Sequence, residues 1–600
     1  MSDALGMFAP EIVLVAVASA IYVAGAFVNR PDLWRWLALA ALLAASVALL
    51  LVPSGRVPGL PLEADLLALY VRWLGLGCGL LLVGTAWRPL AGPATAEFLG
   101  SLLLAVAGVM LTASAQDLLV LFVALELISI PTYIVLYIGR HDASSQEATA
   151  KYFYLSILAS AILLYGFSFL YGVSGSMDLA VVRQRLADLE GPCSAWGTLA
   201  RIALGLIFGG LCFRIAAVPF HFYAPDVYQG TTHANAALLS VLPKIAGLTA
   251  LVRLVAVAMA ELQPYAWPVA LAVAGLTMTL GNVVALWQNH LRRLLAYSSI
   301  AHAGYMLMGL AVFLVPSGRE GPWDGASGLL LYLAVYAVAT IGMFAVLALF
   351  GRDEQQLDHL DELAGLAWTS GPLRPMMAWL MAVFLFSLTG LPPLAGFWGK
   401  LAIFASALQV GQHAAEPTAS WFLALAVLGV LNSAVAAAYY LRIVGLMFFR
   451  MPRATPPVRP GTGGTVGTAV VCALLTVVLI GLYPGLWIGW ARHSSPTVPA
   501  VVPRASRPAD APEAPFRARM DWVSEREPAG GSGLALTHSS PPANPQPPIA
   551  HACHGPSPSR SRGSGPPARF HPPAYLRAGC RSHHCVLQPV VSGVAGSFGG

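Results

Sequence analysis

The sequence carries little charge for its length. Asp, Glu, Lys and Arg make up 10% of its 600 residues, whereas soluble domains carry about 25%. This shortage excludes an ordinary soluble protein. The net charge of +6 is set largely by an Arg-rich tail. The Lys and Arg residues of the body lie singly in loops and form no basic face interleaved with aromatic residues, so we expect no nucleic-acid binding.

Cysteine is also scarce, with 7 residues in the chain. Cys78, Cys193, Cys212 and Cys472 lie in or beside apolar stretches. Their spacing lacks the CxxC pattern, which argues against an iron–sulfur or zinc centre in this region. The apolar body also lacks a nucleotide-binding loop and a nucleophile–base pair. We therefore expect this chain to bind no metal and no cofactor of its own.

Long apolar runs, in contrast, recur along the first four-fifths of the chain. Runs of about 20 residues are long enough to cross a hydrocarbon core of about 30 Å. A signal peptide would give one such run, not many. The predicted fold class is therefore an all-α polytopic membrane protein with about 14 transmembrane helices. We place the spans at 8–28, 33–52, 66–87, 97–114, 117–138, 152–172, 199–223, 234–256, 267–288, 292–314, 327–350, 375–409 (interrupted), 420–449 and 466–490.

The loop charges predict an orientation. Most Lys and Arg residues of the body fall in alternate loops, which the positive-inside rule places on the inner side. Both termini are then expected on the outer side of the membrane. Segment 177–197 has Val182 and Leu186 at helical spacing and predicts a short surface helix. The acidic loop 351–375 predicts a second amphipathic stretch.

Beyond residue 491 the composition changes to Pro, Ser, Arg, Gly and His. Residues 492–600 cannot bury enough apolar surface to fold, which predicts a disordered tail. An extension of the reading frame is the alternative origin. Cys580, His583, His584 and Cys585 have the spacing of metal ligands. We do not expect a zinc site there, because no folded scaffold surrounds them.

Ionisable residues inside spans cost about 2.5–3.5 kcal/mol each to insert, so each needs a reason. Glu126 lies near the middle of its span. It is either a protonated acid bonded to a neighbouring helix or a proton carrier. Lys244 is also central, and burial favours the neutral form of a lysine, which allows it to release and regain a proton. Pro243 leaves the carbonyl of Leu239 without its helical donor, which predicts a locally open, hydrated backbone.

Prolines interrupt the span that contains Arg214. Pro219 would remove the hydrogen bond to the carbonyl of Ile215. A broken helix at membrane depth is tolerated only where it faces protein or water. His221 lies just past the break. It is interpreted either as a packed polar group or as a proton relay.

A second break precedes Lys400 in the segment LTGLPPLAGFWGK. Pro392 and Pro393 free the carbonyls of Leu388 and Thr389. The two breaks lie in spans seven and twelve, an odd number of spans apart, so the second repeat must be inverted relative to the first. Two inverted five-helix repeats are typical of transporters.

Span ten contains His302 in the segment RRLLAYSSIAHAGYMLMGL. Ser298 and Ser299 lie one turn earlier on the same face. A neutral histidine at this depth can pass protons. The alternative is a structural hydrogen bond to a neighbouring helix.

Four segments together resemble one family: DLLVLFVALELISIPTYIVLY, AVPFHFYAPDVYQGTTHANAALLSVLPK, RRLLAYSSIAHAGYM and LTGLPPLAGFWGK. They resemble subunit N of bacterial proton-translocating NADH–quinone oxidoreductase, respiratory complex I. The likeness covers roughly residues 8–490. It implies fourteen helices, with an N-terminal three-helix segment at 1–95, inverted repeats at 96–256 and 267–449, and a last helix at 466–490.

The resemblance also implies the function and the partners. NADH, FMN, iron–sulfur clusters and quinone would belong to other subunits of the complex, and this chain would couple quinone reduction to proton transport. Glu126 would be the acid of span five, Lys244 the central lysine and Lys400 the exit-side basic residue. The lipid bilayer and the other subunits are the expected partners.

One position departs from the family pattern, which has lysine where this chain has Arg214. Arginine is effectively never deprotonated in proteins. We therefore interpret Arg214 as a fixed partner of Glu126 and assign proton shuttling to Lys244, His302 and Lys400. Alternative functions are a subunit of a sodium/proton antiporter or membrane-bound hydrogenase, and a scaffold subunit that conducts nothing.

Overall fold

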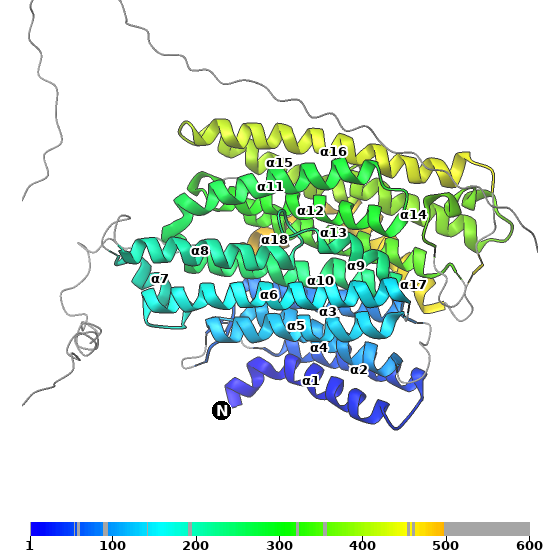
Figure 1. The fold of residues 1–600 in the computed structure, drawn as a ribbon, viewed down its shortest axis with the longest axis horizontal. Helices are drawn as coiled ribbons and strands as arrows, with labels where there is room; N and C mark the ends of the chain where they lie inside the picture. Colours follow the sequence, from blue (N-terminus) through cyan, green and yellow to red (C-terminus); the bar gives the residue numbers. More distant parts are fainter. Residues whose placement is uncertain are drawn as a thin grey trace, which may run out of the picture. The chain divides into compact units, whose positions relative to one another are not determined.

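The structure is a computed structural model that describes residues 2–52, 55–56, 60–87, 94–140, 142–189, 195–319, 323–351, 357–452, 457–458 and 463–496. Cys193, the tail beyond residue 496 and the cluster at residues 580–585 lie outside these ranges. The described residues form a layered bundle of long helices that lie alongside one another (Figure 1). Thirteen helices among them are long and apolar enough to cross a membrane, or up to 14 if one bent pair is counted as a span. The predicted fold class is confirmed.

The first half of the chain begins with two helices, a short hairpin and three further spans. The hairpin is antiparallel and pairs Gly55 with Ala64 and Arg56 with Glu63. The bounds are α1 Ser2–Gly25, α2 Pro31–Leu50, β1 Gly55–Arg56, β2 Glu63–Ala64, α3 Leu66–Thr85, α4 Ala94–Ser114, α5 Leu118–Gly139, α6 Ala143–Ser174, α7 Leu179–Ala187, α8 Ala195–Arg214, α9 Tyr223–Gly230 and α10 His233–Leu251.

The second half contains two π-helical segments and several single turns of 3₁₀ helix. The π-helices are Val252–Ala258 and Leu475–Leu482, and the 3₁₀ turns are Ala260–Leu262, Pro316–Gly318, Leu360–Leu363 and Leu366–Trp368. The α-helices are α11 Gln263–Leu286, α12 Leu291–Phe313, α13 Gly325–Ala348, α14 Leu373–Thr389, α15 Ala395–His413, α16 Thr418–Phe449, α17 Gly463–Leu474 and α18 Pro484–His493.

Several of the few acidic residues serve to start helices. The Asp side chains just before five helices accept hydrogen bonds from the backbone N–H groups of the first turn, which otherwise have no partner. These caps are Asp65 for α3, Asp117 for α5, Asp142 for α6, Asp178 for α7 and Asp324 for α13. Because they cap helices, these five acids lie at the ends of apolar runs rather than inside them.

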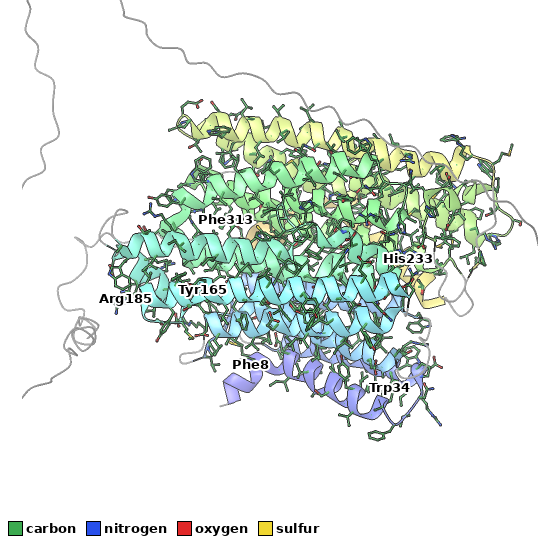
Figure 2. All side chains as sticks on the ribbon, in the orientation of Figure 1. Phe8, Trp34, Tyr165, Arg185, His233 and Phe313 are labelled. Carbon is green, nitrogen blue, oxygen red and sulfur yellow. The ribbon has the colours of Figure 1, made fainter. Side chains whose placement is uncertain are left out.

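The centre of the bundle consists of α10, α12 and α13, and their most apolar stretches are almost wholly buried by other helices. Helices α1, α2 and α16 lie at the edges, and only about a third of the most apolar stretch of each is buried by other helices. Figure 2 places His233, at the start of α10, and Arg185, on α7, at opposite ends of the helices. A side chain in the middle of a central helix therefore lies far from lipid and from either end.

The seventh span is interrupted, as predicted, but the break lies earlier than expected. The helix was predicted to continue to residue 223, and α8 ends at Arg214. Ala216 has φ +57, outside the helical region, and turns lead to the short helix α9. The loss of a hydrogen bond at Pro219 predicted a break near that residue. The chain leaves the helix before Pro219, so Arg214 is the last helical residue.

The twelfth span is broken where its prolines predict. Helix α14 ends at Thr389, Gly390 adopts the left-handed conformation at φ +95, and α15 begins at Ala395. Glycine is favoured there because it has no Cβ to clash. Gly396 then approaches α14 so closely that a Cβ would lie 1.7 Å from the carbonyl oxygen of Ser387. The inverted relation between the two broken segments stays a prediction.

One other expectation needs correction. The final span was predicted as one helix at 466–490, but it leaves the helix at Tyr483, with φ −120 and ψ 56, and restarts as α18 at Pro484. The residue before a proline is disfavoured in the helical region, which accounts for the break. The described part of the acidic loop 351–375 contains two 3₁₀ turns that are bent by 115° relative to α14, whose first residues complete the loop. Leu360 and Leu363 are buried while Asp361 is exposed, as expected for an amphipathic stretch. The short helix predicted within 177–197 is present as α7, with Val182 and Leu186 buried.

A buried ion pair outside the predicted site joins α1 to α3. Arg72 Nε donates to Glu11 Oε1 at 2.8 Å, and its Nη2 donates to Glu11 Oε2 at 2.6 Å. Arg72 is 0% exposed and Glu11 is 2% exposed. Sequence reasoning did not single out either residue.

Replacing Arg72 with methionine is expected to destabilise the protein by about 3–5 kcal/mol, because it leaves the buried Glu11 carboxyl without its cation. The midpoint temperature of thermal aggregation in detergent measures the effect. The double variant Glu11→Gln with Arg72→Met is the control and should recover part of the loss. An unchanged midpoint for the single variant would contradict the assignment.

Candidate functional site

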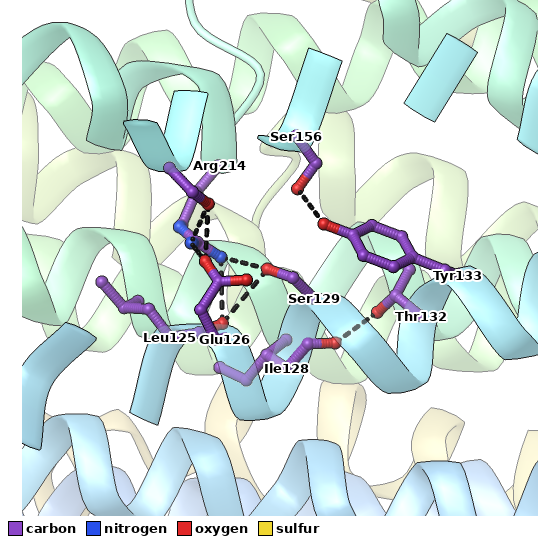
Figure 3. Close-up of polar contacts among 9 residues, drawn as sticks. Leu125, Glu126, Ile128, Ser129, Thr132, Tyr133, Ser156 and Arg214 are labelled. Carbon is purple, nitrogen blue, oxygen red and sulfur yellow. Dashed lines mark hydrogen bonds and ion pairs between the residues drawn. The ribbon is translucent and has the colours of Figure 1, made fainter. Parts of the chain in front are cut away.

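The first element of the site is an ion pair between α5 and the end of α8 (Figure 3). Arg214 Nη2 lies 2.6 Å from Glu126 Oε1 and 3.1 Å from Ser160 Oγ. Its Nη1 donates to the carbonyl of Leu125 at 3.0 Å and to the hydroxyl of Ser129. Ser160 also donates to Glu126 at 2.5 Å. The guanidinium is thus held on several sides, as expected for a fixed positive charge.

A small cavity separates this ion pair from Lys244. Its water-accessible volume is about 10 Å³, close to the room that one water molecule needs. Both cations line it, and so do Leu239 and Pro243, the residues at which the open backbone was predicted. Helix α10 itself runs through Pro243 without a break. The lining residues are Tyr152, Arg214, Ala216, Tyr223, Ala224, Tyr228, Leu239, Pro243 and Lys244.

Lys244 is joined to α12 and α13. Its Nζ donates to the carbonyl of Ser299 at 2.8 Å and to the Ser299 hydroxyl. That hydroxyl also bonds the Tyr336 hydroxyl at 2.7 Å and the Tyr228 hydroxyl at 3.3 Å. Lys244 is 2% exposed. These hydrogen-bond partners of the buried ammonium carry no charge.

His302 lies at the centre of the second half of the site. Its Nδ1 is 2.6 Å from the Tyr332 hydroxyl, and its Nε2 is 2.9 Å from the Tyr440 hydroxyl. Ser298 bonds the same Tyr440 hydroxyl. The adjacent serines of α12 therefore serve two different groups, since Ser299 bonds Lys244 and Ser298 reaches His302 through Tyr440. As predicted, both serines and His302 lie on the face of α12 that is turned toward the site.

Lys400 bridges the break of the twelfth span. Its Nζ donates to the carbonyl of Thr389 at 2.9 Å and to the hydroxyl of Ser433 at 2.8 Å. The Thr389 carbonyl is one of the two that the prolines were predicted to free. The ammonium also lies 4.9 Å from the centre of the Tyr305 ring, a distance suited to a cation–π contact. The break thus supplies a ligand for the buried lysine.

His221 is the remaining residue of the predicted site. It is half-buried in the turn between α8 and α9, and its Nδ1 has no hydrogen-bond partner among the described residues. None of the hydrogen bonds found in the described ranges joins it to Arg214, Lys244 or His302. Its role as a relay stays a prediction.

Two of the sequence segments that carry the family resemblance contact each other. Arg293 Nη1, at the start of α12, lies 2.6 Å from Asp226 and 2.9 Å from Gln229 of the DVYQG segment. Lys151 Nζ reaches the other oxygen of Asp226 at 2.7 Å. Partial burial alone would raise the pKa of Asp226, but the hydrogen bonds from Lys151 and Arg293 outweigh it and hold that pKa below its ordinary value. This anchor fixes α9 and α12 where Tyr228 meets Ser299.

Sequence reasoning missed the tyrosines that line the site. They are Tyr228, Tyr305, Tyr332, Tyr336 and Tyr440. A tyrosine within a span costs little compared with a charge, so it is not conspicuous in an apolar run. The spacing of Tyr332 and Tyr336, one turn apart on a span that is otherwise almost wholly apolar, was the available signal. Within the described ranges, His, Cys, Asp and Glu form no cluster of three or more that could hold a metal ion.

A bundle of membrane-long helices, two broken segments and a buried line of ionisable groups define a multi-pass membrane protein of the antiporter-like class. The family described as NADH:quinone oxidoreductase/Mrp antiporter, transmembrane, matches residues 115–431, which include every predicted site residue. NADH-quinone oxidoreductase subunit N of Rhodospirillum rubrum is 36% identical over 505 residues, 82% of this chain and 97% of its own length. The chain belongs to the subunit N family of NADH-quinone oxidoreductases.

Other relatives and solved structures agree. Subunit N of Trichlorobacter lovleyi is 35% identical over 456 residues, covering 74% of this chain and 88% of the relative. A chain of respiratory complex I from Thermus thermophilus with bound aureothin superposes with a TM-score of 0.63 at 32% identity, over 80% of this chain and 98% of that one. A chain of the Mrp complex from Dietzia has the same TM-score at 24% identity, over 81% and 97%. At that identity the likeness shows the fold alone.

Proposed function

We propose that this chain is the N subunit of a proton-translocating NADH–quinone oxidoreductase and carries protons along its buried ionisable groups. The observation that carries the proposal is the row of Glu126 with Arg214, then Lys244, His302 and Lys400, inside the region that matches the family. Charged residues at this depth are costly and mark ion pathways. NADH oxidation and quinone reduction take place in other subunits, which hold the FMN and the iron–sulfur clusters.

The groups of the row have different tasks. The hydrogen-bond partners described for Lys244 and Lys400 are uncharged, so either lysine can lose a proton without leaving a bonded carboxylate unpaired. Arg214 cannot lose a proton in the same way, because its guanidinium stays protonated. It fixes the charge of Glu126 at the start of the row, and the lysines and His302 move the protons.

A neighbouring subunit covers Glu126 in the assembled complex. The Glu126 side chain is 21% exposed. The exposed large side chains of the same helix α5 are Leu119, Val123, Ile130 and Tyr137. A partly exposed carboxylate at membrane depth needs protein or water against it. The apolar residues around it suit contact with another helix.

The chain lies in the bacterial inner membrane with both termini outside. Charged loop residues assigned to one side of the membrane pair with one another. Arg56 pairs with Asp178, both in loops assigned to the outside, and Arg293 pairs with Asp226 on the inner side. This agreement supports the alternation of the loops, and the excess of Lys and Arg gives its direction.

Purification through a tag on this chain is expected to recover NADH–quinone reductase activity. Vesicles that contain the complex should acidify when NADH is added, at the same rate with and without sodium, because the carried ion is the proton. An antiporter subunit would instead show pH changes that require sodium and no NADH. Recovery of the tagged chain without reductase subunits would contradict the proposal.

A further inference from the structure

The imidazole of His302 is held between two tyrosine hydroxyls that come from different helices. Tyr332 on α13 reaches Nδ1, and Tyr440 on α16 reaches Nε2. His302 and Tyr332 are 1% exposed, and Tyr440 is 0% exposed. The ring thus has a hydroxyl at each nitrogen and is sealed from both lipid and solvent.

This arrangement suits proton transfer through the ring. A neutral imidazole has one nitrogen that donates and one that accepts, and which is which depends on its neighbours. A hydroxyl can do either, so two hydroxyls satisfy both tautomers of the ring. An ammonium at one nitrogen could only donate and would fix the tautomer.

The two tyrosines also lie toward different parts of the site. The Tyr332 ring packs on α15 at Gly399, where a Cβ would come within 2.5 Å of Tyr332 Cδ2, next in sequence to Lys400. Tyr440 bonds Ser298, the neighbour in sequence of the serine that binds Lys244. His302 and its two tyrosines therefore connect the Lys400 side of the site with the Lys244 side.

We propose that Tyr332 and Tyr440 carry the transported proton to and from His302, an inference that rests on the proposed function. In one transfer the O–H bond of Tyr332 breaks as Nδ1–H forms, and the Nε2–H bond breaks as a new O–H bond forms at Tyr440. The former proton of Tyr440 passes to Ser298 Oγ. One proton taken up at the Tyr332 oxygen and one released from Ser298 leave every residue with its starting charge, and the reverse sequence is equally balanced.

The chain offers a matched control in the next residue of α16. Tyr439 is buried, and its hydroxyl donates to Asn282 Oδ1 at 3.0 Å. Asn282 in turn bonds Asn432 at 3.2 Å. These contacts hold α11 against α16. The Tyr439 side chain also lies against Tyr440 and Ser298, but no hydrogen bond of the described residues joins it to a nitrogen of His302. Tyr439→Phe and Tyr440→Phe therefore remove the same atom from adjacent sites with different roles.

The experiment compares protons pumped per NADH oxidised in vesicles that contain the assembled complex. Tyr332→Phe and Tyr440→Phe are each expected to lower the ratio about tenfold or more, because each removes a group that transfers a proton. Tyr439→Phe is expected to keep the wild-type ratio. Ser298→Ala tests the same link with a smaller change, in case Tyr440→Phe does not assemble, and should also lower the ratio. Equal ratios for Tyr439→Phe and Tyr440→Phe, or a wild-type ratio for Ser298→Ala, would overturn the proposal.

A second measurement separates relay from packing. In a His302→Phe background, Tyr332→Phe and Tyr440→Phe should cause no further loss of pumping, because the hydroxyls act through the imidazole. A further loss as large as in the wild type would contradict the relay. Lys244→Met distinguishes the two proposals. If it pumps normally, the proposed function is wrong, whereas if it fails and the tyrosine variants pump normally, only the tyrosine relay is wrong.

Discussion

Vesicles whose complex carries Lys244→Met are expected to oxidise NADH but to pump protons at less than about a tenth of the wild-type ratio per NADH. Methionine is unbranched and close in volume to the lysine stem, so the packing of α10 against α12 and α13 should survive. It holds no proton and makes no bond to Ser299, which the ammonium contacts through both carbonyl and hydroxyl. The measurement is NADH-driven acidification, recorded together with NADH consumption.

Two further variants separate proton transfer from charge and from packing. Lys244→Arg keeps a positive charge but cannot release it, so it should also fail to pump. Thr249→Val changes another buried polar residue of the same helix, whose hydroxyl donates to the Ile245 carbonyl within the helix, and should pump normally. Normal pumping by Lys244→Met would show that the chain is a scaffold. Normal pumping by Lys244→Arg would show that a fixed charge is enough.

Most of the fold could be predicted because a bilayer allows few solutions. A span must be long and apolar, so each predicted span overlaps a helix of the structure. The ends were harder to predict, because single residues decide them. The seventh span ends at Arg214 rather than at residue 223, where Ala216 leaves the helical region before any proline is reached. Pro484 carries a signal for the end of the last long helix, because the residue before a proline is disfavoured in the helical region. The apolar run around it nevertheless predicted an unbroken span.

The ionisable residues of the site could be found from the sequence, but their contacts could not. An ionisable residue within an apolar run is conspicuous, and Lys244, His302 and Lys400 are all buried as predicted. Which groups they contact depends on how distant helices pack. The Tyr440 hydroxyl reaches His302 from 138 positions further along the chain. Periodicity within one helix places Ser298 and Ser299 on a shared face, but it does not show that each serves a different partner.

Arg214→Ala is expected to abolish most proton pumping and to destabilise the protein, whereas Arg214→Lys should keep most of both. The alanine variant leaves Glu126, Ser129, Ser160 and the Leu125 carbonyl without the group that bonds all four. Removing one partner of a buried ion pair costs about 3–5 kcal/mol, and partial exposure of Glu126 places this case near the lower end. A lysine keeps the charge near Glu126, although its three donors cannot reproduce the four contacts.

Glu126→Gln supplies the reciprocal test of a fixed pair. If Arg214 acts by holding the charge of Glu126, the double variant Glu126→Gln with Arg214→Ala should be more stable than Arg214→Ala alone, because no carboxylate is left unpaired. Pumping should stay low in the double variant, since the first group of the row is lost in either case. Normal pumping by Arg214→Ala would refute the partner role. If instead Arg214→Lys pumped faster than the wild type, the arginine at this position would limit a step that a titrating lysine can perform.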